Sequence, residues 1–378
     1  MKKAIVLLLT LLLLPGSVRA AGPTLSAPSA LLMEKETGTI LYAVGEHEAR
    51  EPASVTKVMT LLLVMEAIDS GALAYDDMVT ASPHASSMGG SQIWLKEGEQ
   101  MTVEELLKAV CIVSGNDASV ALGEHLAGSE EAFVARMNER AAELGMADTH
   151  FANCTGLPAE GHHSSAHDIA LMSRELIKKH PDIRRFTTVW TDSLRGGESM
   201  LVNTNKLIRF YPGATGLKTG STDAARYCLS ATAEREGMEL IAVVLAGPTS
   251  DERFADARAM LDYGFATYEL FTVMPQEVLP PIAVTLGKQA TVQPVLTEEN
   301  VLLLEKGRGK NTTQSVTLAE NLPAPVAAGD EVGTLRILDA AGEEVAALAL
   351  FAGESVERVT YFDLLLRFFK TGLGVLEE

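Results

Sequence analysis

Ser54 and Lys57 are the residues whose types and spacing most directly suggest chemistry in this sequence. They are three positions apart, so on a helix their side chains lie on one face and can reach each other. A lysine can act as a base toward a serine hydroxyl when burial or a neighbouring cation keeps its amine neutral. The pair therefore favours acyl transfer through a serine nucleophile. Considered alone, it also fits a serine that caps a helix beside a solvated lysine.

The segment that would position this pair is apolar on nearly every side. Residues 58–68 read Val-Met-Thr-Leu-Leu-Leu-Val-Met-Glu-Ala-Ile, which is typical of a helix buried through the middle of a domain. Ser54 would lie at the N-terminal end of this helix. Unpaired backbone N–H groups and the helix dipole favour developing negative charge there.

Two further polar motifs follow along the chain. Ser114-Gly115-Asn116 separates two apolar helical segments, and Lys218-Thr219-Gly220 leads into a predicted strand over 227–233. A Ser-Gly-Asn break can also be a plain helix-helix turn that its own side chains cap. The segment 82–99 is rich in Ser, Gly and Met, and we expect it to form a lid or wall over a site.

The other patterns predict one mixed domain that closes near Phe271. Hairpins are expected over 29–42 and 227–246, and their strands would join one sheet with helices packed against it. Capping boxes at Thr102 and Ser165 predict the starts of two helices. Further helices are predicted from the spacing of apolar residues over 118–126, 130–144 and 250–261.

A second, β-rich part is expected after the proline-containing segment 274–281. Five strands are predicted at 290–295, 301–304, 314–318, 331–338 and 345–351. The last two are joined by a hairpin turn, Asp339-Ala340-Ala341-Gly342. The five strands together predict a small β-sandwich, and this part of the sequence contains no catalytic motif.

The C-terminal tail has the pattern of an amphipathic helix. Phe362, Leu365, Leu366 and Phe369 fall on one stripe, and the cations of the tail lie off it. Such a helix can lie in a membrane interface with its cations near lipid head groups. It can equally pack on its own domain. The expected division is therefore a signal peptide (1–20), a catalytic domain (21–273), a β-rich domain (274–357) and this tail (358–378).

The N-terminus and the charge of the chain restrict its location and partners. A basic start, an apolar run from Ala4 to Leu14 and small residues before Ala21 predict a cleaved secretory signal. Removing its three cations takes the formal charge from −19 to −22, which makes nucleic acid an unsuitable partner. We therefore expect a protein secreted across the cytoplasmic membrane, into the periplasm or to the outer face of that membrane.

Cysteines and histidines suggest no metal site. Cys111, Cys154 and Cys228 match no metal-ligand spacing and are interpreted as buried small hydrophobes, with one disulfide as the alternative. A histidine group, His162, His163 and His167, lacks a carboxylate at a recognisable spacing. We interpret these histidines as solvated loop residues.

Together the three motifs carry a resemblance to a known family. Ser-x-x-Lys, Ser-x-Asn and Lys-Thr-Gly occur in this order, 60 and 104 residues apart. The chain resembles the penicillin-binding proteins and serine β-lactamases, and most of all the low-molecular-mass D-alanyl-D-alanine carboxypeptidases. Segments 52–60, 114–118, 203–207 and 216–220 all look like family segments. The resemblance implies an α+β fold, with a β-lactamase/transpeptidase-like domain of antiparallel sheet and helices followed by a small β-sandwich domain.

The resemblance also implies roles for the motif residues. Ser54 would attack the carbonyl between the two terminal D-alanines of a peptidoglycan stem peptide, and Lys57 would take its proton, helped by the charge of Lys218. Ser114 would relay a proton to the departing D-alanine, and Asn116 would hold the substrate amide. The remaining assignments concern substrate binding. Lys218 and Thr219 would bind the terminal carboxylate, Gly220 would let substrate lie along the strand, and the N–H groups of Ser54 and Ser221 would form the oxyanion hole. β-Lactam antibiotics would acylate the same serine, and no metal or cofactor is needed.

Two alternatives remain open at this point. A class A β-lactamase typically has Ser-Asp-Asn at the second motif and a Glu-x-x-x-Asn element after it, but here Glu160 is followed by Gly-His-His-Ser. The added β-rich domain also argues against a β-lactamase. A non-catalytic wall-binding scaffold would be free to lose motif residues, yet all of them are present. Transpeptidase and endopeptidase activities would use the same residues with a different acceptor.

Overall fold

A computed structural model of the protein describes residues 22–296 and 300–372. The expected signal peptide, residues 1–20, lies outside the described residues. Within the described ranges, the structure contains no helix that is both long and apolar enough to cross a membrane.

One antiparallel sheet forms the centre of the first domain, in the order β2-β1-β9-β8-β7. Its strands are β1 (Ser29–Glu34), β2 (Ile40–Val44), β7 (Ala214–Thr222), β8 (Arg226–Arg235) and β9 (Met238–Gly247). Both expected hairpins are present, as β1–β2 and β8–β9. β1 also pairs with β9, with Leu31 opposite Val243, so the two hairpins meet in the middle of the sheet. β2 and β7 form its two edges.

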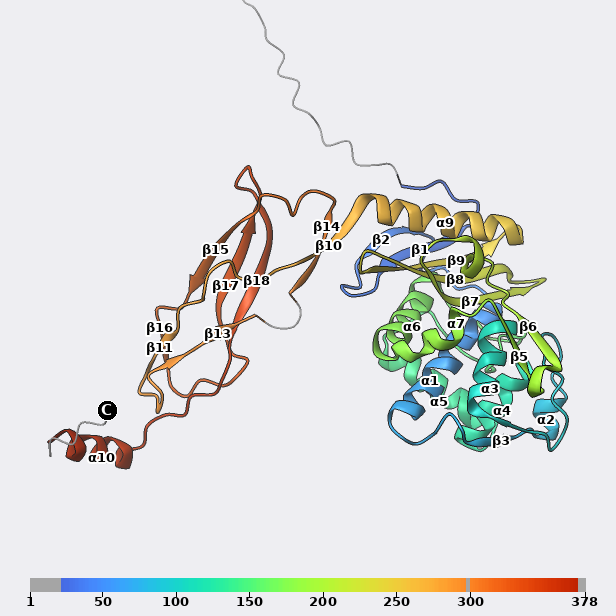
Figure 1. The fold of residues 1–378 in the computed structure, drawn as a ribbon, viewed down its shortest axis with the longest axis horizontal. Helices are drawn as coiled ribbons and strands as arrows, with labels where there is room; N and C mark the ends of the chain where they lie inside the picture. Colours follow the sequence, from blue (N-terminus) through green and yellow to red (C-terminus); the bar gives the residue numbers. More distant parts are fainter. Residues whose placement is uncertain (1–21, 297–299, 373–378) are drawn as a thin grey trace, which may run out of the picture.

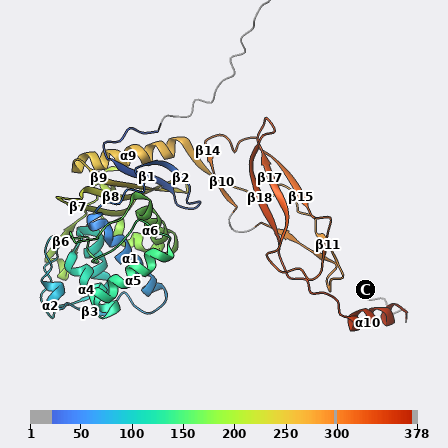
Figure 2. The ribbon, with the colours of Figure 1, turned by 180° about the vertical axis from the view of Figure 1, so that it is seen from behind.

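Helices cover both faces of the sheet (Figure 1 and Figure 2). On one face lies α9 (Ser250–Thr267), whose Met260 and Leu261 pack against Leu32 and Leu240 of the strands. A larger apolar core on the other face surrounds α1 (Lys57–Asp69). The other helices of this domain are η1 (Ala53–Thr56), α2 (Pro83–Ser86), α3 (Val103–Lys108), η2 (Ala109–Val113), α4 (Asn116–Ala127), α5 (Glu130–Glu143), α6 (Ala166–Lys179), η3 (Pro181–Ile183), α7 (Arg184–Thr187), η4 (Arg195–Gly197) and α8 (Leu207–Phe210). Two short ribbons complete it, β3–β4 (Met78–Thr80, Gln100–Thr102) and β5–β6 (Thr191–Leu194, Ser199–Val202).

α1 is the buried helix that its sequence predicts, because apolar side chains on all its sides are buried, among them Val58, Leu61, Leu62 and Met65. Ser54, however, lies in the 3₁₀ turn η1 before α1 rather than in the α-helix itself. This turn lets the chain change direction directly before Lys57.

Helix starts differ from the predictions in small ways that have clear causes. The capping box at Thr102 is complete. Ser165 accepts a hydrogen bond from Asp168 N at 3.2 Å. The Asp168 carboxylate does not return this bond, because it accepts from Asp148 N and Thr149 Oγ1 instead. The predicted capping box at Ser165 is therefore only a one-sided cap.

The C-terminal part is β-rich, as expected. A three-stranded sheet, β12-β11-β16, and a four-stranded sheet, β13-β18-β17-β15, share a core that includes Ile282, Val292, Leu335 and Ile337. The strand predicted at 301–304 pairs elsewhere, with the strand that follows α9, in a separate ribbon. The bounds are β10 (Tyr268–Thr272), β11 (Ile282–Thr285), β12 (Thr291–Val292), β13 (Pro294–Val295), β14 (Val301–Glu305), β15 (Thr313–Leu318), β16 (Asn321–Pro323), β17 (Glu331–Leu338), β18 (Glu344–Ala352) and, in the tail, α10 (Tyr361–Gly372).

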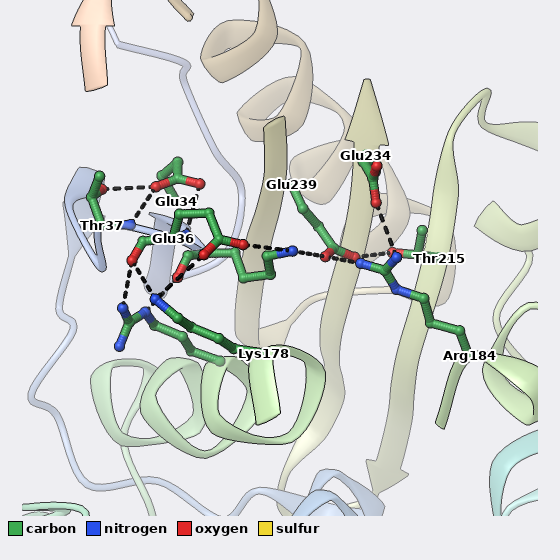
Figure 3. Close-up of polar contacts among 10 residues, drawn as sticks. Glu34, Glu36, Thr37, Lys178, Arg184, Thr215, Glu234 and Glu239 are labelled. Atoms are coloured by element: carbon green, nitrogen blue, oxygen red, sulfur yellow. Dashed lines mark hydrogen bonds and ion pairs between the residues drawn. The ribbon is translucent and has the colours of Figure 1, made fainter. Parts of the chain in front are cut away.

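A buried carboxylate, Glu239 of β9, connects the start of β7 to α7 and to the turn between β1 and β2 (Figure 3). Glu239 is fully buried, and its Oε1 accepts a hydrogen bond from Thr215 Oγ1 at 2.7 Å. Its Oε2 contacts the guanidinium of Arg184 and lies 3.2 Å from Lys35 Nζ. The network therefore ties β7 to α7 and to the β1–β2 turn, ahead of the Lys-Thr-Gly motif that β7 carries.

Candidate active site

Ser54 and Lys57 meet as the sequence predicts. Lys57 Nζ donates a hydrogen bond to Ser54 Oγ at 2.9 Å, and the lysine side chain is fully buried. The same nitrogen donates to Asn116 Oδ1 at 2.6 Å and to the carbonyl oxygen of Thr155 at 2.7 Å. Two acceptors from two other segments therefore hold the amine beside the serine hydroxyl. The Thr155 carbonyl was not predicted, because a backbone group has no residue-type signature.

Burial controls the proton on Lys57. It lowers the pKa of the Lys57 amine well below its usual range, and the charge of Lys218 lowers it further. Burial also lowers the pKa of Lys218 to about 7. The sequence suggested the charge of Lys218 as the cause of the low Lys57 pKa. This charge is the smaller contribution, because removal from water penalises the charged form of each lysine more strongly. A neutral amine can then accept the proton of Ser54.

Two glycines allow close packing around the turn that carries Ser54. A Cβ on Gly220 would lie 2.8 Å from Ser54 N and 2.9 Å from Val55 N. A Cβ on Gly156 would lie 1.9 Å from the carbonyl oxygen of Ala53, and Gly156 also has a φ of +84°. Gly220 was predicted for substrate access along β7. The structure gives it another reason, since the backbone of Ser54 packs directly on it.

Ser114 and Asn116 flank the pair from the junction between η2 and α4. Ser114 has a φ of +65°, and its Oγ is buried without a hydrogen-bond partner among the residues that the structure describes. Asn116 begins α4, two residues earlier than predicted. Its Oδ1 accepts from Lys57, and its Nδ2 donates to the carbonyl of Gly89 at 2.6 Å. Each end of this amide has one of these partners in the free protein, and the second N–H of Nδ2 leaves a donor for a substrate amide.

The third motif lies on edge strand β7. Lys218 Nζ donates to the carbonyl oxygen of Thr219 at 2.8 Å, and Ser221 follows in the same strand. Thr219 Oγ1 is hydrogen-bonded to Thr204 Oγ1 at 2.7 Å, and Thr204 N donates to the carbonyl of Ile112 in η2 at 3.0 Å. Thr204 thus connects the third motif to the element before the second. In the sequence, Thr204 lies in the family-like segment 203–207, but the resemblance assigned this residue no role.

Arg253 of α9 approaches the same strand from behind. Its Nη1 donates to the carbonyl oxygens of Gly220 and Cys228, each at 3.0 Å. Burial lowers the pKa of its guanidinium to about 10. The sequence suggested only that this residue begins a helix. The structure places a buried cation behind the Lys-Thr-Gly strand.

The segment 82–99 forms a wall beside the site, as expected. The buried Asp117 carboxylate accepts hydrogen bonds from Ile93 N at 3.1 Å and from Leu95 N at 3.0 Å. Asn116 N donates to the carbonyl of Ser91 at 2.7 Å. The wall is therefore fastened to the start of α4, next to the Asn116 side chain that contacts Lys57.

The interpretation of His162 as a solvated residue is wrong. It is 4% exposed, and its ring bonds Thr56 Oγ1 at 2.8 Å and Ala152 N at 3.0 Å. The loop 151–162 packs against η1 and α1, which the sequence pattern did not predict. His163 and His167 are partly exposed. Among the described residues, no group of three or more His, Cys, Asp or Glu could hold a metal ion.

The three cysteines are free and buried, so the interpretation as small hydrophobes is confirmed. Burial raises the pKa of the Cys111 thiol to about 12 and that of Cys228 to about 11. Neither thiol is therefore available as a thiolate near neutral pH.

A buried lysine hydrogen-bonded to a serine, placed between a helical layer and the edge of an antiparallel sheet, defines a serine acyl-transfer site of the β-lactamase/transpeptidase class. Comparison with known families agrees with this class. The family model for D-alanyl-D-alanine carboxypeptidase, peptidase S11, matches residues 17–249. The model for the C-terminal domain of penicillin-binding protein 5 matches residues 268–358.

Individual relatives support the same assignment. The D-alanyl-D-alanine carboxypeptidase DacF of Bacillus subtilis is 44% identical over 346 residues, which cover 90% of this chain and 88% of the relative. The crystal structure of penicillin binding protein 5 from Haemophilus influenzae has a TM-score of 0.81 at 29% identity, covering 90% of this chain and 100% of that one. Penicillin-binding protein D2 from Listeria monocytogenes, in its ampicillin-bound form, has a TM-score of 0.60 at 33% identity, covering 65% and 99%.

The chain therefore belongs to the D-alanyl-D-alanine carboxypeptidase family, peptidase S11. As a member it is a serine hydrolase and a penicillin-binding protein homologue that acts on peptidoglycan peptides of the cell wall. The α+β fold expected from the sequence, with its C-terminal β-rich domain, is confirmed.

Proposed function

We propose that Ser54 is the nucleophile that removes the terminal D-alanine from peptidoglycan stem pentapeptides. The observation that carries this proposal is the buried Lys57 amine, 2.9 Å from Ser54 Oγ, with a pKa that burial lowers. Lys57 accepts the hydroxyl proton as Ser54 Oγ bonds to the carbonyl carbon between the two D-alanines. The bond from that carbon to the D-alanine nitrogen then breaks, and water hydrolyses the ester left on Ser54.

Ser114 relays a proton to the departing nitrogen in this proposal: its hydroxyl gives its own proton to the nitrogen and regains the one that Lys57 took from Ser54. Its Oγ has no hydrogen-bond partner among the described residues, which supports its availability to a substrate. A general acid must deliver its proton as the carbon–nitrogen bond breaks. Asn116, which contacts Lys57, holds the amide of the stem peptide through the second N–H of Nδ2.

The edge strand β7 binds the substrate. Lys218 and Thr219 bind the terminal carboxylate, because an ammonium and a hydroxyl both donate to carboxylate oxygens. Gly220 lets the stem peptide lie along the strand as an added strand. The backbone N–H groups of Ser54 and Ser221 stabilise the oxyanion that forms during the attack.

Intact-mass analysis after incubation with benzylpenicillin tests the nucleophile, with Ser54→Ala as the matched control. We expect an adduct that decays slowly in the wild type, none in the variant, and release of D-alanine from a pentapeptide by the wild type alone. Rapid penicillin hydrolysis without a persistent adduct would indicate a β-lactamase instead. A folded wild type with neither adduct nor hydrolysis would refute the assignment of Ser54.

We infer further that the chain acts outside the cytoplasm, in the periplasm or on the outer face of the cytoplasmic membrane. The predicted signal peptide over residues 1–20 and the cell-wall substrate of the family support this location. We also propose that the mature chain divides into domains 21–273 and 274–357 and a tail, 358–378. The separate apolar cores of the two parts support the division, although Val273 itself is buried in the core of the β-rich part.

We propose that the tail contacts the membrane surface. Exposed apolar side chains gather on α10 and support this: Tyr361, Phe362, Leu364, Leu365 and Phe368. Burial of such a face in a lipid interface removes apolar area from water. Co-sedimentation of the mature chain with anionic lipid vesicles tests the proposal, with a chain ending at residue 357 as the control. Equal sedimentation of the two chains would refute it.

A further inference from the structure

We propose that His162 is a positioning residue, which holds the turn carrying Ser54 and the loop carrying the Thr155 carbonyl in one fixed arrangement. Its imidazole lies between Thr56, directly before Lys57 in the chain, and Ala152 at the start of the loop. The inference rests on the proposed acylation of Ser54. It adds a residue that the three sequence motifs do not contain.

The hydrogen bonds of His162 fix its tautomer. A backbone N–H can only donate, so Ala152 N donates to Nδ1 across 3.0 Å, and Nδ1 carries no proton. The hydrogen of the neutral ring is therefore on Nε2, which donates to Thr56 Oγ1 across 2.8 Å. Thr56 is fully buried and His162 is nearly so, hence water cannot replace either partner without rearrangement.

The same loop supplies two more contacts to the base of the active site. The carbonyl of Cys154 accepts from Thr60 Oγ1 of α1 at 2.7 Å, and the carbonyl of Thr155 accepts from Lys57 Nζ at 2.7 Å. By bonding both Ala152 and Thr56, His162 joins the beginning and end of this loop to the nucleophile turn. A shift of the imidazole therefore changes the position of the Thr155 carbonyl relative to the Lys57 amine.

The surroundings keep this imidazole neutral. Burial, with smaller contributions from the nearby His163 and His150, lowers the pKa of His162 to about 4. On the side of α1, Lys57 follows Thr56 directly, so a proton on the ring would add a cation near the buried amine. It would also remove the acceptor for Ala152 N. The ring is therefore a fixed spacer, rather than a proton carrier, over the pH range of the proposed reaction.

This arrangement predicts an effect on the proton affinity of Lys57. A carbonyl oxygen accepts a stronger hydrogen bond from an ammonium than from a neutral amine, so the Thr155 carbonyl favours the charged form. If the loop shifts enough to lose this hydrogen bond while Lys57 stays buried, the pKa of Lys57 falls further, because burial, the larger cause of its low pKa, is unchanged. The acid limb of the acylation rate then shifts to lower pH, while the rate on the plateau falls because Ser54 and Lys57 lose alignment.

The test is the second-order rate of acylation by benzylpenicillin between pH 5 and pH 9, with thermal unfolding measured in parallel. His162→Ala should acylate roughly tenfold to a hundredfold more slowly, with its acid limb at lower pH. His162→Gln, whose amide nitrogen can still reach Thr56, should recover part of the rate. His163→Gln, at the adjacent and partly exposed histidine, is the matched control and should acylate like the wild type.

A double-mutant cycle identifies the contact itself. Thr56→Val should slow acylation and Thr56→Ser should not, because serine keeps the hydroxyl. The double variant Thr56→Val/His162→Ala should be little slower than the slower single variant, since both remove one contact. The inference is overturned if the effects of Thr56→Val and His162→Ala on the acylation rate are additive. It is also overturned if His162→Ala keeps the acid limb of the wild type or acylates at the wild-type rate. An unacylated wild type would instead overturn the proposed role of Ser54, and this inference with it.

Discussion

Replacement of Gly156 by alanine should disable the nucleophile turn without removing any motif residue. The added Cβ would lie 1.9 Å from the carbonyl oxygen of Ala53, and even a 3.0 Å separation requires a displacement of about 1.1 Å. The positive φ of Gly156 adds about 1–2 kcal/mol of backbone strain for any other residue. Because a misplacement of about 1 Å in an active site can cost roughly a hundredfold in rate, acylation of Ser54 should fall by about that factor.

Gly161 provides the matched control, because it lies on the same loop with a φ of +77°. A Cβ on Gly161 would lie 3.7 Å from His150 Cδ2, which is an ordinary van der Waals contact. Gly161→Ala therefore carries the backbone strain without the collision. We expect it to lose about 1–2 kcal/mol of unfolding free energy and to keep its rate of acylation by benzylpenicillin. A folded Gly156→Ala that acylates at the wild-type rate would refute this reasoning, as would an equal loss of rate in Gly161→Ala.

Two further predictions concern buried charges. Burial lowers the pKa of Lys218 from 10.5 to about 7, so between these values the unfolded chain binds more protons and stability rises with pH. Lys218→Met should therefore raise the melting temperature most at pH 7 and below and less toward pH 10. An equal change in melting temperature at pH 7 and pH 10 would contradict this prediction. A similar pH trend in the exposed control variant Lys206→Met would also contradict it. Glu239→Gln should lower the unfolding free energy in urea by roughly 3 kcal/mol, because it leaves Arg184 and Lys35 beside a neutral buried group. Glu234→Gln, a more exposed partner of Arg184, should cost less than about 1 kcal/mol, and equal losses would contradict this account.

The sequence predicted the central pair and the fold because both depend on side-chain type and spacing. Ser54 and Lys57 are neighbours on one short turn, so their contact follows from local geometry alone. Hydrophobic patterning likewise predicted α1, both hairpins of the catalytic domain and the C-terminal strands β14, β15, β17 and β18. It missed β11 and β16, and it joined β12 and β13 into one strand. It could not identify the partner of β14, because strand pairing depends on where distant segments arrive rather than on alternation within the strand.

The parts of the site that were missed involve backbone groups and distant loops. The carbonyl of Thr155 carries no residue-type signal. His162 is 106 positions from Thr56, with no spacing rule that could connect them. Arg253 lies on the far side of the sheet from α1, and only the sheet order places it behind β7. The larger effect of burial on the pKa of Lys57 can be recognised only in the folded structure, because a sequence can indicate a neighbouring cation but not the removal of water.

The pairing of β1 with β9 determines when the site can form. A strand near residue 31 finds its partner near residue 243, and β7, which supports Ser54 through Gly220, joins the sheet only through β8 and β9. Such long-range pairing closes a large loop and makes folding slow. Although Ser54 is among the first residues of the domain to be synthesised, its surroundings are completed by nearly the last strand. Until β9 has paired with β1, the turn that carries Ser54 lacks the support of Gly220, and the serine hydroxyl lacks its active-site surroundings.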